Sequence, residues 1–251
     1  IVAGLCLLAA GVACTAHAAP LTKWDFNVAL GPNNAPAPSF GAGSATPVGM
    51  NGGNNAADIV AATGNPVSSD PGVPNNAWRV RGGTSNGWSG TTPLLSGAQF
   101  NASTAGAQNI VVSFEVHATD GSARHAQFQY TTDGTNFTSL GDLIDFNLSF
   151  DGFKAFSYDL SSIPAVNNNP SFGFKLVSAF SPVEFTNANG VQPANTAFQR
   201  ASGTTQVYTG AAGNWRFDLV SIDSVPEPSS LGLAGLAITA GGLRRARRRR
   251  D

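Results

Sequence analysis

The chain has 251 residues, of which 42% are hydrophobic and only 12% charged, and this length and composition exclude a chain that is disordered throughout. Six of its 14 Lys and Arg residues lie at the extreme C-terminus, and without them and Asp251 the chain has eight basic and 14 acidic residues, a net charge of −6. We therefore predict no nucleic-acid partner, since proteins that bind nucleic acids carry an excess of basic residues.

The N-terminal segment, residues 1–19, is an apolar run that ends in small residues. Its last part, Ala16-His17-Ala18, has the A-x-A form of a signal-peptidase site. We expect a signal peptide that lacks its true start, because neither Met nor a basic region precedes the run. The Sec machinery would export the chain, and signal peptidase would cleave in the region of Ala16, Ala18 and Ala19. A lipoprotein signal at Cys14 and a buried core helix are the alternatives.

Both cysteines of the chain, Cys6 and Cys14, lie in this segment. Once it is removed, the mature chain has no thiol, which excludes thiol catalysis and zinc bound by cysteine. A domain of about 200 residues is large enough to be stable outside the cytoplasm without disulfides.

The region from 20 to 224 shows the period-2 alternation of half-buried strands and no amphipathic helix of useful length. Around 110–118, for example, Ile110, Val112 and Phe114 share one face of a strand. After Leu219 the apolar parity slips, which indicates a β-bulge or burial on both faces. The predicted strands are 23–30, 77–82, 97–102, 110–118, 124–131, 153–160, 171–180, 204–209 and 215–222.

Turn signals separate these strands. Asp120-Gly121 joins 110–118 to 124–131, and Asp133-Gly134 closes a hairpin into Phe137. One-sided alternation with frequent turns predicts an all-β fold, an antiparallel β-sandwich, and the absence of βαβ units argues against a nucleotide-binding α/β fold. Two stretches rich in Gly, Asn and Pro, 31–76 and 181–203, are expected to be long loops, either functional or merely solvated.

Two short stretches resemble parts of a known architecture. Residues 128–137 (FQYTTDGTNF) and 213–220 (GNWRFDLV) are similar to a strand–turn element and to the final core strand of extracellular jelly-roll modules, including carbohydrate-binding ones. The resemblance implies a jelly-roll-like sandwich and names no ligand, because one fold serves many functions.

The histidines and acids of this region offer few candidate catalytic or metal-binding sets. His117 and His125, with Glu115 near them, form a conceivable metal set, but polar residues on a sheet face are the simpler interpretation, and we predict no metal site there. Asp142 and Asp145 are the acids that a polysaccharide hydrolase would use if they met in a cleft. The sequence has no nucleophile elbow, P-loop or H-E-x-x-H motif, so no catalytic residue is predicted.

Two further residues are candidates for ligand contacts. We predict no cofactor; a structural calcium ion bound by Asp218 or by loop carbonyl groups is the alternative, although no EF-hand-like spacing supports it. Trp88 lies in the turn-like stretch 85–90, where burial is less automatic than in a strand, and its ring is a candidate platform for a sugar. Trp78 and Trp215 lie in strand-like runs and are expected in the core.

Residues 225–251 combine three features in a fixed order. The first is Val225-Pro226-Glu227-Pro228, whose prolines hold the chain extended. The second is the apolar run 231–243, which as a helix spans about 20 Å, less than the roughly 30 Å hydrocarbon core of a bilayer. The third is a cluster of terminal arginines, which stays on the cytoplasmic side of a membrane. They are Arg244, Arg245, Arg247, Arg248, Arg249 and Arg250.

This order of motif, short transmembrane helix and terminal arginines resembles the PEP-CTERM sorting signal of exported proteins in Gram-negative bacteria that make exopolysaccharide. The resemblance implies recognition and cleavage by an exosortase, transient anchoring in the inner membrane, and release or attachment outside the cell. An ordinary tail anchor with an incidental Pro-Glu-Pro is the alternative.

Together these observations predict an exported, exosortase-processed surface or extracellular-matrix protein. Its β-sandwich would be non-catalytic and associated with exopolysaccharide. The alternative is a secreted polysaccharide hydrolase that uses Asp142 and Asp145.

Overall fold

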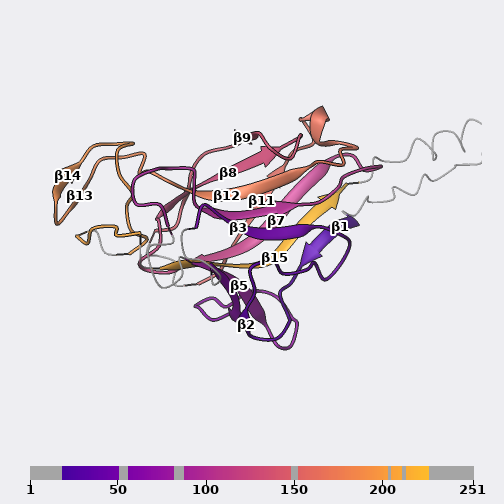
Figure 1. Ribbon diagram of the computed structural model, residues 1–251, viewed down its shortest axis with the longest axis horizontal. Helices are drawn as coiled ribbons and strands as arrows, with labels where there is room; N and C mark the ends of the chain where they lie inside the picture. The colour runs from indigo at the N-terminus through magenta and orange to yellow at the C-terminus, as the bar shows by residue number, and fades with distance from the viewer. Residues whose placement is uncertain are drawn as a thin grey trace, which may run out of the picture.

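Two antiparallel sheets pack face to face in the computed structural model of the protein (Figure 1). The structure describes residues 19–50, 56–81, 88–147, 152–202, 205–210 and 213–225. The predicted signal peptide up to residue 18, and the sorting signal from Pro226 onward, lie outside the described residues. The predicted all-β antiparallel sandwich is confirmed.

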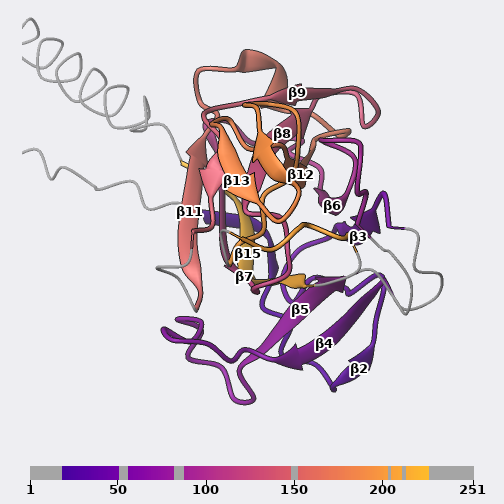
Figure 2. The ribbon, with the colours of Figure 1, turned by 90° about the vertical axis from the view of Figure 1, so that its left-hand side faces the viewer.

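The larger sheet has seven strands, which are β1 (Ala19–Trp24), β2 (Gly31–Pro32), β4 (Ala57–Ala61), β5 (Asn76–Arg81), β7 (Ile110–Ala118), β11 (Lys154–Asp159) and β15 (Asn214–Ser224). Their order is β11-β7-β15-β5-β4-β2, and β1 pairs with the second half of β15. Figure 2 shows β5, β4 and β2 side by side at one edge of this sheet.

The smaller sheet has six strands, which are β3 (Ser44–Val48), β6 (Gly97–Asn101), β8 (His125–Thr131), β9 (Phe137–Ser139), β10 (Ile144–Asp145) and β12 (Gly173–Ala179). Their order is β10-β8-β12-β6-β3, and β9 pairs with β8. A separate hairpin is formed by β13 (Phe185–Asn187) and β14 (Gly190–Gln192), and a short 3-10 helix, η2, covers Pro164–Val166.

The core consists of the aromatic and aliphatic side chains that the period-2 pattern turns inward from both sheets. Phe114 of β7 stacks on Phe128 of β8 with ring centroids 6.4 Å apart, and Trp78 of β5 meets Phe100 of β6 edge-on at 5.7 Å. The chain alternates between the sheets from β6 through β7, β8, β11 and β12 to β15. This alternation makes the sandwich jelly-roll-like.

The stretch 31–76, expected to be one long loop, contains β2, β3, β4 and the start of β5. The Gly and Pro content of this stretch led to the prediction of a loop. Pro32 and Pro47 are compatible with strands because they lie on β2 and β3, each at the edge of its sheet, where a missing N–H costs no ladder hydrogen bond. The second expected loop, 181–203, contains the β13–β14 hairpin.

Two predicted strands are also corrected. Residues 25–30 do not extend β1, and the described residues of 204–209 form no strand. The hairpin at Asp133-Gly134 is confirmed, because Thr131 pairs with Phe137. Asp120-Gly121, in contrast, connects two strands that belong to different sheets.

The slip in parity after Leu219 is a β-bulge. The register between β15 and β7 shifts between Asp218 and Ser221, and Leu219 has a φ of 46°. The bulge returns Val220 and Ile222 to the core, so that both halves of the strand bury apolar side chains.

The two ends of the sandwich have different roles in the chain. Ala19, the first residue of β1, pairs with Ser224, the last residue of β15, and Pro226 follows two residues later in the sequence. The beginning of β15 lies at the other end, toward the β13–β14 hairpin (Figure 1). The predicted leader and the sorting signal therefore leave the domain at one place.

Candidate functional site

The two histidines do not form a metal set. Phe114 and Val116 face the core from β7, which places His117 on the outer face of the larger sheet, where its Nδ1 lies 3.1 Å from the carbonyl oxygen of Thr63. His125 lies on β8, in the other sheet. In the described part of the chain, no three His, Asp or Glu side chains are arranged to hold a metal ion.

The acids nominated for a hydrolase are not arranged for catalysis. Asp145 accepts two hydrogen bonds from Arg124, at 2.6 Å from Nε and 2.8 Å from Nη2. Burial alone would raise the pKa of Asp145, but the hydrogen bonds and charge of Arg124 lower it. Asp142 is exposed on the surface. A glycosidase acid needs a raised pKa, and Asp145 has the opposite.

Trp88 is not an exposed platform. Its side chain is 1% exposed, and its ring meets that of Trp215 edge-on with centroids 4.7 Å apart. Its indole Nε1 donates a hydrogen bond to the carbonyl oxygen of Gly213 at 3.2 Å. The ring of Trp88 is packed in the hydrophobic core, as are the rings of Trp78 and Trp215. Among the aromatic residues that the structure describes, only Phe40 has more than half of its surface exposed.

Asp218 lies in a buried acidic group. It pairs in register with Glu115, and its Oδ1 accepts a hydrogen bond from the N–H of Leu219 at 2.7 Å, while Oδ2 is buried. Burial raises the pKa of Asp218 to about 7, and the charges of Asp70 and Glu115 act in the same direction. Because Asp218 is fully buried, it has no access to a substrate. Calcium binding by Asp218 stays a prediction.

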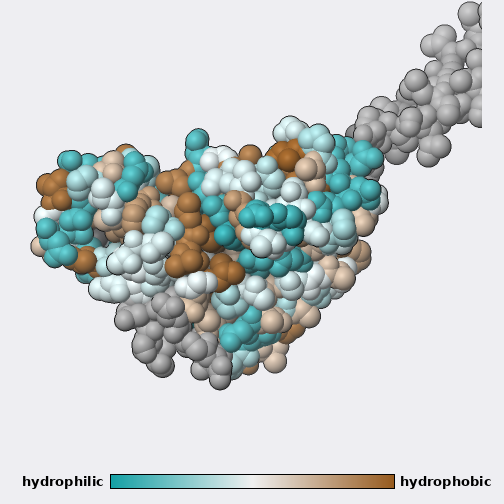
Figure 3. Space-filling view, turned by 45° about the horizontal axis from the view of Figure 1, so that its top comes forward, coloured by the Kyte–Doolittle hydropathy of each residue, from teal (hydrophilic) through white to brown (hydrophobic). Residues whose placement is uncertain are grey.

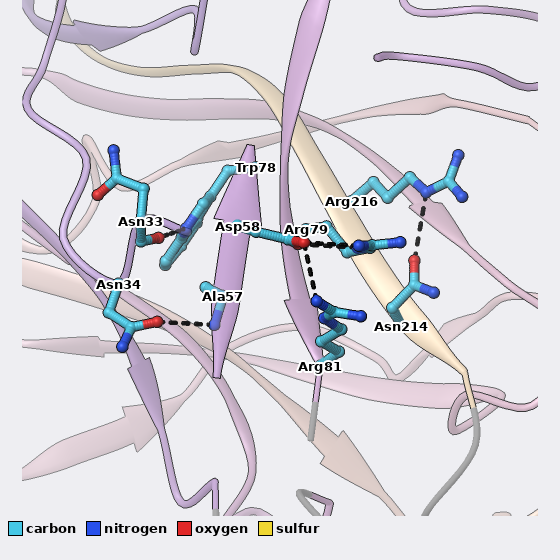
Figure 4. A network of polar contacts seen from close by, with 9 residues as sticks. All are labelled: Asn33, Asn34, Ala57, Asp58, Trp78, Arg79, Arg81, Asn214 and Arg216. Atoms are coloured by element: carbon cyan, nitrogen blue, oxygen red, sulfur yellow. Dashed lines mark hydrogen bonds and ion pairs between the residues drawn. The ribbon is translucent and has the colours of Figure 1, made fainter. Parts of the chain in front are cut away.

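The outer face of the larger sheet carries a row of charged side chains, which Figure 4 shows in part. The register aligns His117 of β7 with Arg216 of β15, Arg216 with Arg79 of β5, and Arg79 with Asp58 of β4. Asp58 binds Arg79 through both oxygens, at 2.8 and 2.6 Å, and also Arg81 at 2.9 Å. One carboxylate thus holds two guanidinium groups.

The surface of the described residues includes three hollows. The first, of about 600 Å³, is lined by His117, Asp120, Arg200, Asn214 and Arg216 among others. The second, of about 270 Å³, lies beside the β13–β14 hairpin and contains Tyr208, and the third, of about 440 Å³, contains Gln99 and Asn101. Asp142 and Asp145 line none of these three hollows. Figure 3 shows that the face it presents mixes hydrophobic patches with hydrophilic residues.

The sequence pattern had no signal for the first hollow. Arg200 and Arg216 are separated by 16 residues with no shared motif, and Arg79 precedes both by more than a hundred residues. The only local hint was the alternation of Arg79 and Arg81 with buried residues in one strand.

The chain thus combines a β-sandwich with a C-terminal segment that has the features of a sorting signal. Residues 224–250 match the family described as the PEP-CTERM protein-sorting motif. The motif marks the chain as an exported exosortase substrate whose C-terminal region anchors it transiently in the membrane. Within the described residues, no helix is long and apolar enough to cross a membrane.

No curated protein matches the chain in sequence. Among solved structures, the CBM22-1 xylan-binding domain of Paenibacillus barcinonensis Xyn10C is 10% identical, with a TM-score of 0.39, over 84% of this chain and 98% of that domain. The K1 cleaved adhesin domain of Lys-gingipain from Porphyromonas gingivalis W83 is 12% identical, with a TM-score of 0.40, over 80% and 96%. A Stig cyclase from Fischerella sp. TAU is 12% identical, with a TM-score of 0.34, over 87% and 92%. At these TM-scores the similarities assign no function to the chain.

Proposed function

We propose that the protein is a surface or extracellular-matrix protein that is processed by exosortase and whose non-catalytic β-sandwich associates with exopolysaccharide. The observation that carries this proposal is the sorting motif at residues 224–250. Before processing, the Sec machinery exports the chain and signal peptidase removes residues 1–19.

The fold supports this order of events. The last strand of the sandwich, β15, ends at Ser224, and Val225 is held by two hydrogen bonds with Asn109, at 3.1 and 3.3 Å. Pro226 follows at once, so cleavage beyond the Pro-Glu-Pro motif removes no strand of either sheet. The domain keeps its whole core after the tail is removed.

The absence of catalysis is supported by the state of the acids. Asp145 is occupied by Arg124, and Asp218 is buried out of reach of a substrate. A glycoside hydrolase needs two carboxyl groups that face one cleft.

Two measurements test the proposal. The intact mass of the protein recovered from outside an exosortase-producing cell should show the loss of residues 229–251, and their retention would contradict processing. The same protein should bind the exopolysaccharide of that cell in a pull-down and release no reducing sugar from it. Release of saccharide would favour the hydrolase.

A further inference from the structure

The charges of the sandwich are unevenly distributed. Outside the terminal arginines the chain has eight Lys and Arg residues, and four of them gather around the first hollow and the strands next to it. We call this set the arginine group, and it consists of Arg79, Arg81, Arg200 and Arg216.

We propose that the arginine group and the first hollow form a binding site for the carboxylate groups of an acidic polysaccharide. This inference rests on the proposed function and names the class of polysaccharide. The other two hollows are lined by neutral residues alone, so among the three only the first selects for charge.

The arginine group is held in place by its neighbours. Nη1 of Arg216 donates to Oγ1 of Thr63 at 2.7 Å, and its Nε donates to Oδ1 of Asn214 at 3.2 Å (Figure 4). Arg200 donates to Gln206 from Nη1 and lines the first hollow together with Arg216. Two planar guanidinium groups that share one hollow suit a carboxylate, which accepts hydrogen bonds in pairs.

Within the described residues, the acids next to the arginine group are fewer than its arginines. Asp58 neutralises part of Arg79 and Arg81, and Asp120 lines the hollow, so in this part of the chain two carboxylates lie beside the four arginines. Two other acids, Glu115 and Asp218, lie one row further along the same sheet face. They are buried, Glu115 beneath Ser69, and they line none of the three hollows.

The hollow also offers hydrogen bonds for sugar hydroxyl groups. Thr63, Thr119 and Asn214 line it beside the two arginines. Its volume of about 600 Å³ leaves room for more than one sugar ring. A nucleic acid is the weaker candidate, because the net charge of −6 on the chain without its C-terminus repels a polyanion of high charge density.

The position of the hollow fits a protein held by its tail. Asn214, which lines the hollow, begins β15, whereas Ser224 ends it next to the sorting motif. The length of this strand puts the hollow roughly 30 Å from the point where the tail leaves the domain. A membrane surface at the tail is therefore remote from the arginine group, which argues against anionic lipid as its ligand.

The test uses the full chain in a nonionic detergent and oligogalacturonate as the probe, with fully methyl-esterified oligogalacturonate as its uncharged match. The charged probe should bind more tightly, and Arg200→Gln or Arg216→Gln should weaken its binding by about tenfold. Lys23→Gln removes the same charge elsewhere and should leave binding unchanged. Circular dichroism of each variant shows whether the fold is kept, and Arg200→Gln, at an isolated bridge to Ala123 outside the strands of both sheets, keeps the test open if Arg216→Gln unfolds.

The outcomes separate this inference from the proposed function. If both probes bind equally and the arginine variants have no effect, the acidic-polysaccharide site is wrong while polysaccharide association stands. If neither these probes nor the producing cell's own exopolysaccharide binds, both are wrong. Tighter binding of a short DNA duplex, or of phosphatidylglycerol in mixed detergent micelles, through the same arginines would also overturn the inference.

Discussion

Asp218 of β15 lies directly opposite Glu115 of β7, and both carboxyl groups are buried on the same side of the larger sheet. Glu115 is satisfied by the N–H of Ser69 at 2.9 Å and by the hydroxyl of the same residue. Oδ1 of Asp218 accepts a hydrogen bond from the N–H of Leu219, and Oδ2 is buried with only the Ser68 side chain nearby to lower its pKa. Two carboxyl groups so placed favour a proton on one of them, and the less satisfied Asp218 takes it.

The protonation of Asp218 predicts a stability that falls as the pH rises. Its pKa is about 7 in the folded protein and about 3.9 in the unfolded chain, so the folded state holds the proton more tightly. The stabilisation is complete below pH 4 and is lost as the pH rises through 7. At pH 8 the free energy of unfolding of Asp218→Asn, measured by urea denaturation, should exceed that of the wild type by up to about 4 kcal/mol. The difference should shrink toward pH 5. Asp142→Asn, on the surface, is the control. A difference in unfolding free energy between Asp218→Asn and the wild type that is the same at every pH would contradict the prediction.

His125 predicts the opposite slope. Its side chain is 3% exposed, and burial lowers its pKa to about 4. The folded pKa lies below the unfolded value of about 6.5, so stability is present above that pH and is lost as the pH falls toward 4. Between pH 6.5 and pH 4 the wild type should therefore lose up to about 3 kcal/mol of unfolding free energy through His125. His125→Gln should not show this part of the loss. An imidazole NMR titration midpoint near 6.5 for His125 would show the reasoning to be wrong.

Trp88 should matter for folding and not for binding. Trp88→Ala removes a buried ring that contacts Trp215 and should lower the free energy of unfolding by about 3–5 kcal/mol. Phe40→Ala, at a ring that is 54% exposed, is the matched control and should change it by no more than about 0.5 kcal/mol. Urea denaturation measures both. Lost saccharide binding in a Trp88→Ala protein of unchanged stability would restore Trp88 as a ligand platform.

The sorting motif should be needed for processing. Glu227→Ala alters the Pro-Glu-Pro recognition sequence, and we expect the exported protein to keep its tail and stay in the membrane fraction. Glu184→Ala, an exposed acid of the sandwich, should be processed like the wild type. Mass spectrometry of the fractions decides, and a mature mass identical in all three proteins would count against the motif.

The terminal arginines should set the topology of the tail. Replacing all six with Gln removes the charges that hold this end in the cytoplasm. The variant should yield less processed protein, because the motif is then no longer presented on the outer side. Protease accessibility of the tail in intact spheroplasts measures its orientation, and an orientation equal to that of the wild type would disprove this role.

The features that depend on neighbouring residues could be predicted from the order of the amino acids. Period-2 alternation at 110–118 predicted a strand, the slip after Leu219 predicted the bulge, and the order of residues 225–251 predicted the sorting signal. Each of these depends on the order and spacing of residues within one strand or one peptide, which the sequence shows directly.

The pairing of the strands could not be predicted in this way, because alternation shows that a strand has a buried face without showing which strand lies beside it. Alternation therefore did not show that His117 and His125 are in different sheets or that the ring of Trp88 is buried against Trp215. It also did not show that Arg216 lies beside Arg79 on the neighbouring strand and lines one hollow with Arg200.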